Sequence, residues 1–239
     1  AFVKGTFYKV LATIMQKLAH KIICVSEYQA SFLQQKKCVI TVPNALPQNF
    51  VNRLTPNFQA AFKRKHILML GSLKLYKSPL EFIELTKRLP QFIFVLVIND
   101  TKENINIFIK EYKINISKNL TIYPQQNDVV PFYNQTSLVL NLSNKKQFVE
   151  TFGLTALEAM SAGLPVIVPT EGGIAEMVVD GENGYKIDVQ NLNQIAECIK
   201  TILSDETLYM ELAQNALAYS KRFSEAKMVN SIEMILNRK

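Results

Sequence analysis

Residues 138–168 read LVLNLSNKKQFVETFGLTALEAMSAGLPVIV, and this stretch indicates the fold class most clearly. Two apolar runs, Leu138–Leu142 and Val166–Val168, enclose a segment with helical spacing over Leu154–Ala162. The helix is predicted to end at Gly163-Leu164-Pro165, because glycine accepts the left-handed conformation at a helix end and proline cannot continue a helix. A strand, a helix and a second buried strand in this order predict a β-α-β unit with parallel strands.

The same alternation continues along the chain in both directions. Further strands are predicted at Ile22–Val25, Val39–Val42, Ile67–Leu70, Phe92–Ile98, Leu120–Tyr123 and Gly184–Ile187. Further helices are predicted at Glu27–Gln35, 78–89, Thr101–Tyr112, Val129–Asn134, Ile174–Val179, Leu192–Leu203, Glu206–Tyr219 and Glu225–Asn237. The expected fold class is α/β, a Rossmann-like parallel sheet with helices on both faces, and ligands bind such sheets at the carboxyl ends of the strands.

Prolines and amide residues between 44 and 56 predict a linker or a crossing between two domains. About 40 residues precede it, which are too few for an independent core of this class. We therefore expect residues 1–43 to be the remnant of one domain and residues 44–222 to be a complete second one. The last helix, residues 223–239, is expected to pack back towards the N-terminal part.

The composition is that of an ordinary globular protein, with 48% hydrophobic and 20% charged residues among 239. It excludes a disordered or collagen-like chain. No apolar run reaches the about 18 residues that a membrane-spanning helix needs, and no signal peptide is recognised after Ala1. Cys24, Cys38 and Cys198 show no C-x-x-C spacing, which argues against a zinc cluster and favours the reducing cytoplasm.

Positive charge is concentrated in the first half of the chain. Residues 1–118 hold 18 Lys and Arg against 6 Asp and Glu, and the first 65 residues hold ten basic residues and one acid. One interpretation is attraction to an anionic membrane surface, which would make the protein peripheral on the inner face of the cytoplasmic membrane, or to phosphate-bearing substrates. The alternative is that abundant lysine merely solvates helix faces. No nucleic-acid partner is expected, because no recognition motif is present and Arg numbers only 5.

The loop after the strand Ile67–Leu70 contains Gly71, Ser72 and Lys77 and leads into a predicted helix. In that helix Ser78 is expected as N-cap of a capping box. Free N–H groups and the dipole at a helix start favour a phosphate, and Lys77 would stand beside it as a counter-charge. A solvated loop lysine is the competing interpretation.

Two further segments carry candidate site residues. Glu150 precedes the helix Leu154–Ala162, and Glu158 lies inside it among apolar neighbours, where a carboxylate needs a polar partner such as a ribose diol. Gly153 would let backbone N–H groups approach a ligand. Gly172-Gly173 joins the next strand to the next helix, and taken alone it is equally consistent with simple turn chemistry.

In this order the segments resemble the C-terminal half of a family 4 retaining glycosyltransferase of the GT-B fold. The matching residues are Val42-Pro43-Asn44, Gly71 with Lys77, Glu150 and Glu158 with Phe152-Gly153-Leu154 between them, Glu158-Ala159-Met160 with Gly163 and Pro165-Val166, Gly172-Gly173 with Glu176, and Asp180-Gly181 with Gly184. Upstream, residues 22–26 resemble the last strand of the family's N-terminal domain. The resemblance spans about residues 20–236.

The resemblance implies transfer of a sugar from a nucleoside-diphosphate donor to a saccharide or lipid-linked glycan, with retention of configuration and no cofactor or metal. Residues 1–43 would then come from the acceptor domain and 44–222 would bind the nucleotide sugar. Glu150 would lie against the sugar and Lys77 would neutralise the diphosphate, both as catalytic residues. The implied donor contacts are Gly71, Ser72, Lys77, Gln125 near the base, Thr151, Phe152, Gly153, Leu154, Glu158 on the ribose, Gly172 and Gly173.

Some positions depart from the family pattern. Ser72 stands where the family has Arg, Ser78 where it has Gly, and Asn99-Asp100 replaces a glycine near the base. With most of the acceptor domain missing, the chain is expected to bind donor without transferring sugar alone. A non-catalytic binding or partner subunit is the alternative function. The bias towards Lys, Asn and Ile is typical of an AT-rich bacterial genome, and a role in cell-envelope polysaccharide synthesis is an association only.

Overall fold

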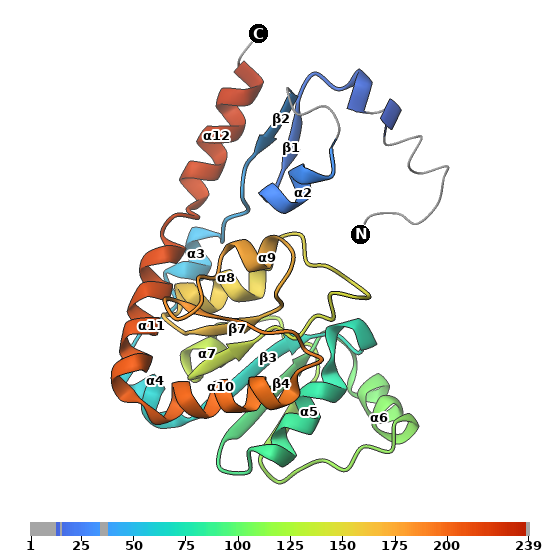
Figure 1. Ribbon diagram of the computed structural model, residues 1–239, viewed down its shortest axis with the longest axis vertical. Coiled ribbons are helices and arrows are strands. Elements are labelled where there is room, and N and C mark those ends of the chain that lie inside the picture. Colours follow the sequence, from blue (N-terminus) through green and yellow to red (C-terminus); the bar gives the residue numbers. More distant parts are fainter. Residues whose placement is uncertain (1–12, 15, 34–37, 238–239) are drawn as a thin grey trace.

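The structure is a computed structural model that describes residues 13–14, 16–33 and 38–237 (Figure 1). Residues 1–12, with which the predicted domain remnant and the basic segment begin, lie outside this description. The described chain forms a large lobe, residues 58–220, and a small lobe, residues 22–41.

Six parallel strands form the sheet of the large lobe. In spatial order they are β5 (Leu120–Tyr123), β4 (Ile93–Ile98), β3 (His66–Gly71), β6 (Leu138–Leu140), β7 (Val166–Val168) and β8 (Gly184–Lys186). Ile67 of β3 pairs with Phe94 on one side and with Leu138 on the other. Strands β6 and β7 are buried at every position, as expected for parallel strands covered on both faces. The predicted Rossmann-like sheet is confirmed.

Helices cover both faces of this sheet. They are α4 (Phe58–Arg64), α5 (Pro79–Arg88), α6 (Lys102–Glu111), α7 (Val130–Asn134), α8 (Leu154–Ser161), α9 (Gly173–Glu176), α10 (Leu192–Ser204) and α11 (Glu206–Ser220). Helix α5 packs with α10, whereas α11 packs with α4 and α8; Figure 1 shows α5 and α10 on one side of the strands and α8 on the other. None of the helices in the described ranges has the length and apolar character needed to cross a membrane.

The small lobe consists of β1 (Ile22–Cys24), α2 (Glu27–Ser31) and β2 (Val39–Thr41), and its two strands pair in parallel. It is followed by α3 (Gln48–Val51). Helix α12 (Glu225–Asn237) begins beside this connection, where Ser224 bridges Leu46 and the Glu225 carboxylate accepts the N–H of Gln48 at 2.8 Å. The domain limits given above stay a prediction.

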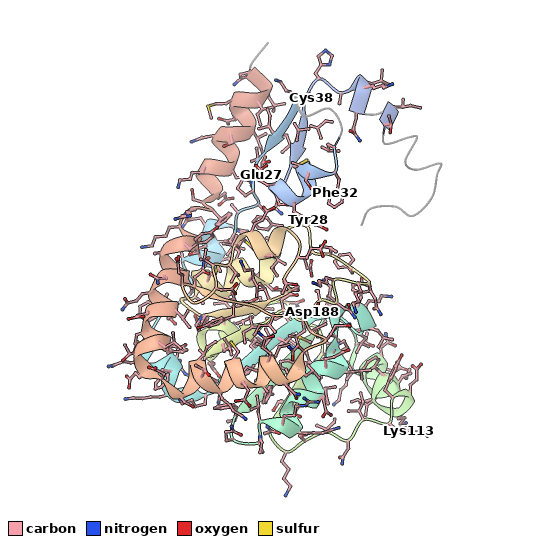
Figure 2. All side chains as sticks on the ribbon, viewed as in Figure 1. Glu27, Tyr28, Phe32, Cys38, Lys113 and Asp188 are labelled. Carbon is pink, nitrogen blue, oxygen red and sulfur yellow. The ribbon has the colours of Figure 1, made fainter. Side chains whose placement is uncertain are left out.

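The small lobe contacts the large lobe through the start of α2. The Ser26 hydroxyl donates to the Thr151 carbonyl at 2.6 Å. The Glu176 carboxylate accepts the backbone N–H of Glu27 at 3.1 Å and that of Tyr28. A carboxylate at this position satisfies N–H groups that have no partner within the helix and complements the helix dipole. Figure 2 shows Glu27 and Tyr28 on the side of the small lobe that faces the large lobe.

Local details differ from the sequence-based expectations. Ser78 precedes α5 as its N-cap but makes no capping hydrogen bond, so the predicted capping box is wrong. Its backbone is left-handed, with φ of 57°, and this conformation turns the hydroxyl into the interior, where it finds no hydrogen-bond partner among the described residues. Helices α3 and α4 were not predicted as elements, because prolines dominate the sequence around them.

Candidate functional site

The site lies where the order of the strands reverses. From β3 the chain builds β4 and β5 on one side of the sheet and then returns to place β6, β7 and β8 on the other. Between β3 and β6 the adjacent loops run in opposite directions, and the resulting crevice at the carboxyl ends is the ligand site of such sheets. A cleft of about 600 Å³ lies here, and it is lined by Asn44, Met69, Leu70, Gly71, Lys77, Val97, Asn99, Gln126, Val129, Asn141, Leu142, Ser143, Glu150, Thr151, Phe152, Gly153, Leu154 and Thr155.

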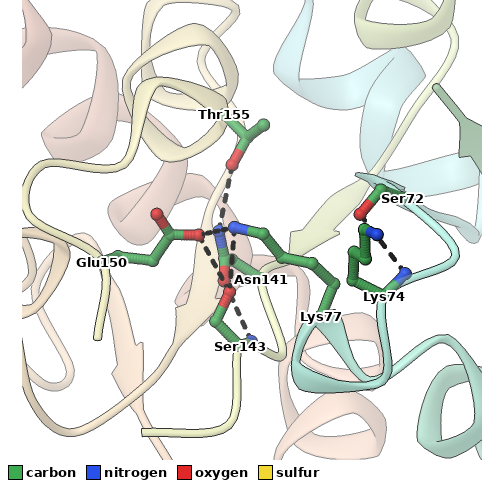
Figure 3. A network of polar contacts seen from close by, with 7 residues as sticks. All are labelled: Ser72, Lys74, Lys77, Asn141, Ser143, Glu150 and Thr155. Carbon is green, nitrogen blue, oxygen red and sulfur yellow. Dashed lines mark hydrogen bonds and ion pairs between the residues drawn. The ribbon is translucent and has the colours of Figure 1, made fainter. Parts of the chain in front are cut away.

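Lys77 and Glu150 form an ion pair in this cleft (Figure 3). Lys77 is the last residue of the short 3-10 helix η2 (Leu75–Lys77) after β3, and Glu150 precedes α8. Only 24% of the Lys77 side chain and 15% of the Glu150 side chain are exposed. The Ser143 hydroxyl lies 3.5 Å from the Lys77 Nζ and donates to Glu150 Oε1 at 2.9 Å. An anion that binds Lys77 must therefore compete with Glu150.

Aromatic packing connects the two loops that carry this pair. The Tyr76 ring stacks on the Phe148 ring, with centroids 4.8 Å apart. The Asn144 N–H donates to the Tyr76 carbonyl at 2.7 Å, and the Lys77 Nζ lies 4.8 Å from the centre of the Phe148 ring. The stacked rings and the backbone bond fix the position of Lys77 relative to the loop that ends in Glu150.

Polar side chains after β6 extend the network. Asn141 Nδ2 donates to the Thr155 hydroxyl at 3.2 Å, and Asn141 Oδ1 accepts the Ser143 N–H at 3.1 Å (Figure 3). Asn141 thus connects the end of β6 to the first turn of α8. The first N–H groups of that helix have no partner within it and carry its positive dipole end, so the cleft wall formed by Leu154 and Thr155 favours an anion.

The glycines around α8 and α9 serve close packing. Gly153 has φ of 101°, and a Cβ there would lie 2.4 Å from the Ile174 side chain. A Cβ on Gly172 would lie 2.4 Å from the Glu150 carbonyl, and one on Gly173 would lie 1.9 Å from the Thr151 carbonyl. The Gly173 N–H also donates to the Glu150 carbonyl at 2.8 Å. These glycines hold the start of α9 against the backbone of the loop that presents Glu150.

Glu158 has a buried partner. The Tyr133 hydroxyl, on α7, donates to Glu158 Oε2 at 2.5 Å. Burial raises the pKa of Glu158 above the ordinary carboxyl value, while the hydrogen bond from Tyr133 opposes that rise. Burial together with the nearby Glu158 charge raises the pKa of Tyr133 well above its usual value, so the phenol stays a donor. The apolar sequence around Glu158 indicated that its carboxylate needs a polar partner, and the Tyr133 hydroxyl is such a partner.

The structure brings together most, but not all, of the predicted site residues. Lining the cleft are Gly71, Lys77, Glu150, Thr151, Phe152, Gly153 and Leu154. Outside the lining are Ser72, Gln125, Glu158, Gly172 and Gly173. Gln126, which follows Gln125, lines the cleft in its place. Asn99 and the strand end that includes Gln126 were expected near the base, whereas Asn141 and Ser143 were missed as site residues. Both follow the carboxyl end of β6, which is the signal that could have found them.

The described residues hold no group of three or more His, Cys, Asp or Glu side chains arranged to hold a metal ion. The charged groups of the cleft are Lys77 and Glu150. This arrangement can bind an anionic group at the Lys77 ammonium and the start of α8, and it places the Glu150 carboxylate beside that group.

The sheet order, the cleft at its reversal point and the second, smaller lobe define one half of a GT-B type protein. The family model of the glycosyl transferases group 1 matches residues 53–219. The chain belongs to this family, and the resemblance found in the sequence is confirmed.

Curated relatives and solved structures agree with this assignment. The N-acetyl-alpha-D-glucosaminyl L-malate synthase of Bacillus anthracis is 30% identical over 142 residues, 59% of this chain and 36% of that protein. An uncharacterized glycosyltransferase of Haemophilus influenzae is 24% identical over 226 residues, 90% of this chain and 61% of its own length. The chain thus spans less than two thirds of either relative.

Among solved structures, Anabaena HepE in complex with UDP superposes with a TM-score of 0.82 at 20% identity, covering 100% of this chain and 69% of the other. The C-terminal domain of a group 1 glycosyl transferase from Francisella tularensis superposes with a TM-score of 0.57 at 25% identity, covering 72% of this chain and 96% of that domain. The first likeness supports the fold, and the second matches 72% of this chain to a C-terminal domain.

Proposed function

We propose that this chain supplies the donor site of a glycosyltransferase that transfers a sugar from a UDP-sugar to a saccharide or lipid-linked acceptor, with retention of configuration. The observation that carries the proposal is the Lys77–Glu150 pair in the cleft between β3 and β6. Solved neighbours include complexes of HepE with UDP and with UDP-glucose, and this supports uridine as the nucleoside.

In the proposed complex the diphosphate displaces Glu150 from Lys77. The ammonium and the N–H groups at the start of α8 then face the phosphate oxygens, on which negative charge develops as the bond to the sugar breaks. Ser143 keeps its hydrogen bond to Glu150, so that the freed carboxylate remains beside the sugar. The acceptor oxygen forms its bond to the anomeric carbon on the face that UDP leaves, and its proton passes to the departing phosphate oxygen.

Calorimetric titration with UDP tests the donor site. The wild-type chain is expected to bind, and UDP at one hundred times the Kd should stabilise it by about 2.7 kcal/mol, a rise in Tm of about 5–10 °C. Lys77→Met should weaken UDP binding by about tenfold or more, because it removes a charge-assisted hydrogen bond. Glu150→Gln should bind UDP about threefold more tightly, because the competing carboxylate loses its charge.

Lys87→Met is the matched control, since Lys87 is exposed on α5 and pairs with Glu84 outside the cleft. Its UDP affinity should equal that of the wild type. Equal weakening by both lysine variants, or no UDP binding at all, would contradict the proposed donor site.

Retention is tested with UDP-glucose and water as the acceptor. In a protein that includes the second domain, proton NMR should detect α-glucose first, before mutarotation, whereas early β-glucose would contradict retention. Binding of UDP-glucose without release of glucose, in this chain and in one that includes the second domain, would favour the non-catalytic binding subunit.

A further inference from the structure

We propose that Tyr133 is a positioning residue for recognition of the nucleotide ribose, because its buried hydroxyl holds the Glu158 carboxylate in one orientation next to the cleft. The inference rests on the proposed function, in which a nucleotide occupies the cleft.

The Tyr133 side chain has little freedom to move. It is 1% exposed, and the Phe50 ring packs against its ring edge to face, with centroids 6.3 Å apart and planes at 79°. Its hydroxyl donates to Glu158 Oε2 at 2.5 Å. Among the residues that the structure describes, this phenol is the one hydrogen-bond partner of the Glu158 side chain.

Helical spacing places the pair directly behind the cleft wall. Val129 lines the cleft one turn before Tyr133, and the Tyr133 N–H donates to the Val129 carbonyl. Thr155 lines the cleft three residues before Glu158 on α8. Residues three or four apart share a helix face. Tyr133 therefore lies on the same face as Val129, and Glu158 on the same face as Thr155, one turn further from the cleft.

The chemistry of the pair fits a diol. An ionised carboxylate offers about four lone-pair positions, and Tyr133 uses one, which leaves Oε1 and part of Oε2 for two ribose hydroxyl donors. Burial alone disfavours the ionised form of Glu158, and the bond from Tyr133 counteracts burial. A fixed acceptor-only carboxylate distinguishes a ribose from a sugar without hydroxyls.

Tyr133→Phe tests this role by removing one oxygen atom. UDP and 2′,3′-dideoxy-UDP, which lacks the diol, are titrated into both proteins in the calorimeter. Tyr133→Phe should weaken UDP about tenfold and change the affinity for the dideoxy nucleotide less than twofold. A packing role would weaken both nucleotides equally, and that result, or an unchanged affinity for UDP, would overturn the inference.

A second test combines Tyr133→Phe with Glu158→Gln, and it distinguishes an effect that passes through the Glu158 carboxylate from an effect on packing. In this double variant the removal of the Tyr133 hydroxyl leaves no buried charge without a partner. In the Glu158→Gln background, Tyr133→Phe should leave the ratio of the two affinities unchanged, and a further fall would overturn the inference. Tyr112→Phe, at an exposed tyrosine that follows α6 outside the cleft, is the matched control and should behave as the wild type. A wild-type chain that binds neither nucleotide would instead refute the proposed function and this inference with it.

Discussion

Lys77, Glu150 and Ser143 form a connected group of polar side chains in the cleft. In the structure the ammonium is neutralised by the carboxylate, and the buried hydroxyl contacts both. The pair avoids the cost of a partly buried charge without a partner. The same pairing keeps Glu150 oriented, so that no new side chain has to be recruited when an anion takes Lys77.

Glu158 leads to a prediction about pH. Because its pKa is raised in the folded protein, the folded state binds this proton more readily than the unfolded state. The stability contributed at this position is therefore lost as pH rises through the folded pKa. Glu158→Gln does not titrate, so its Tm relative to the wild type should be more favourable at pH 7 than at pH 4, measured by calorimetry.

Glu84 provides a control of opposite sign. A hydrogen bond from Lys87 holds the pKa of Glu84 below its usual value, so the wild-type residue adds stability above the ordinary carboxyl pKa and loses it as pH falls. Glu84→Gln should thus become less favourable, relative to the wild type, as pH rises from 3 to 6. A Glu158→Gln difference that follows the same direction as Glu84→Gln would contradict the effect of burial.

Not every residue of the site could be predicted from the sequence. Lys77 and Glu150 follow strands on either side of the reversal point. Each lies at a short, recognisable distance from a glycine, Gly71 or Gly153, so both could be predicted from the sequence. Tyr133 has no such pattern, since its contact to Glu158 spans 25 residues and depends on how α7 packs against α8. The left-handed backbone of Ser78 could not be predicted either, because serine ordinarily caps a helix with its side chain.

For the helices and strands, the sequence predicted the alternation and some of the bounds. Strands β5 and β7 and helix α12 have the predicted bounds. A proline directly follows each of the two strands, and proline cannot donate a hydrogen bond to a sheet. Helix α9 was predicted over Ile174–Val179 but covers Gly173–Glu176. The apolar residues beyond it, Met177 and Val178, are buried without being helical, since burial alone does not set where a helix ends.

The packing of α9 against the loop before α8 predicts a large effect of one methyl group. Gly173→Ala would place its Cβ 1.9 Å from the Thr151 carbonyl, so backbone must shift. We expect the free energy of unfolding to fall by about 1–3 kcal/mol, measured by urea denaturation. Gly71→Ala is the control, because its Cβ would meet only the Lys77 Cβ at 3.9 Å. Equal stabilities of the two variants would contradict this packing argument.

At the scale of the whole molecule, two lobes of unequal size meet through few bonds. The six-stranded sheet has a continuous core, whereas the two-stranded sheet of the small lobe buries little and leaves Ile23 42% exposed. Local opening of the small lobe should therefore need less free energy than unfolding of the large lobe.

Glu176→Ala tests this difference in stability. The variant loses the carboxylate that accepts the N–H groups of Glu27 and Tyr28, an interaction expected to contribute about 1 kcal/mol. Hydrogen exchange in residues 22–33 should become about fivefold faster, with exchange in α10 and α11 unchanged. Glu182→Ala, in the turn before β8, is the control. Faster exchange throughout both lobes would show instead that they open as one unit.

Thr151 of the large lobe contacts the small lobe. Its carbonyl receives the Ser26 hydroxyl at 2.6 Å, while the residue itself borders the cleft and adjoins Glu150. A change in the angle between the lobes would therefore act on the peptide that follows Glu150. The backbone around Glu150 is thus held by a contact from the small lobe as well as by the packing of Gly173 within the large lobe.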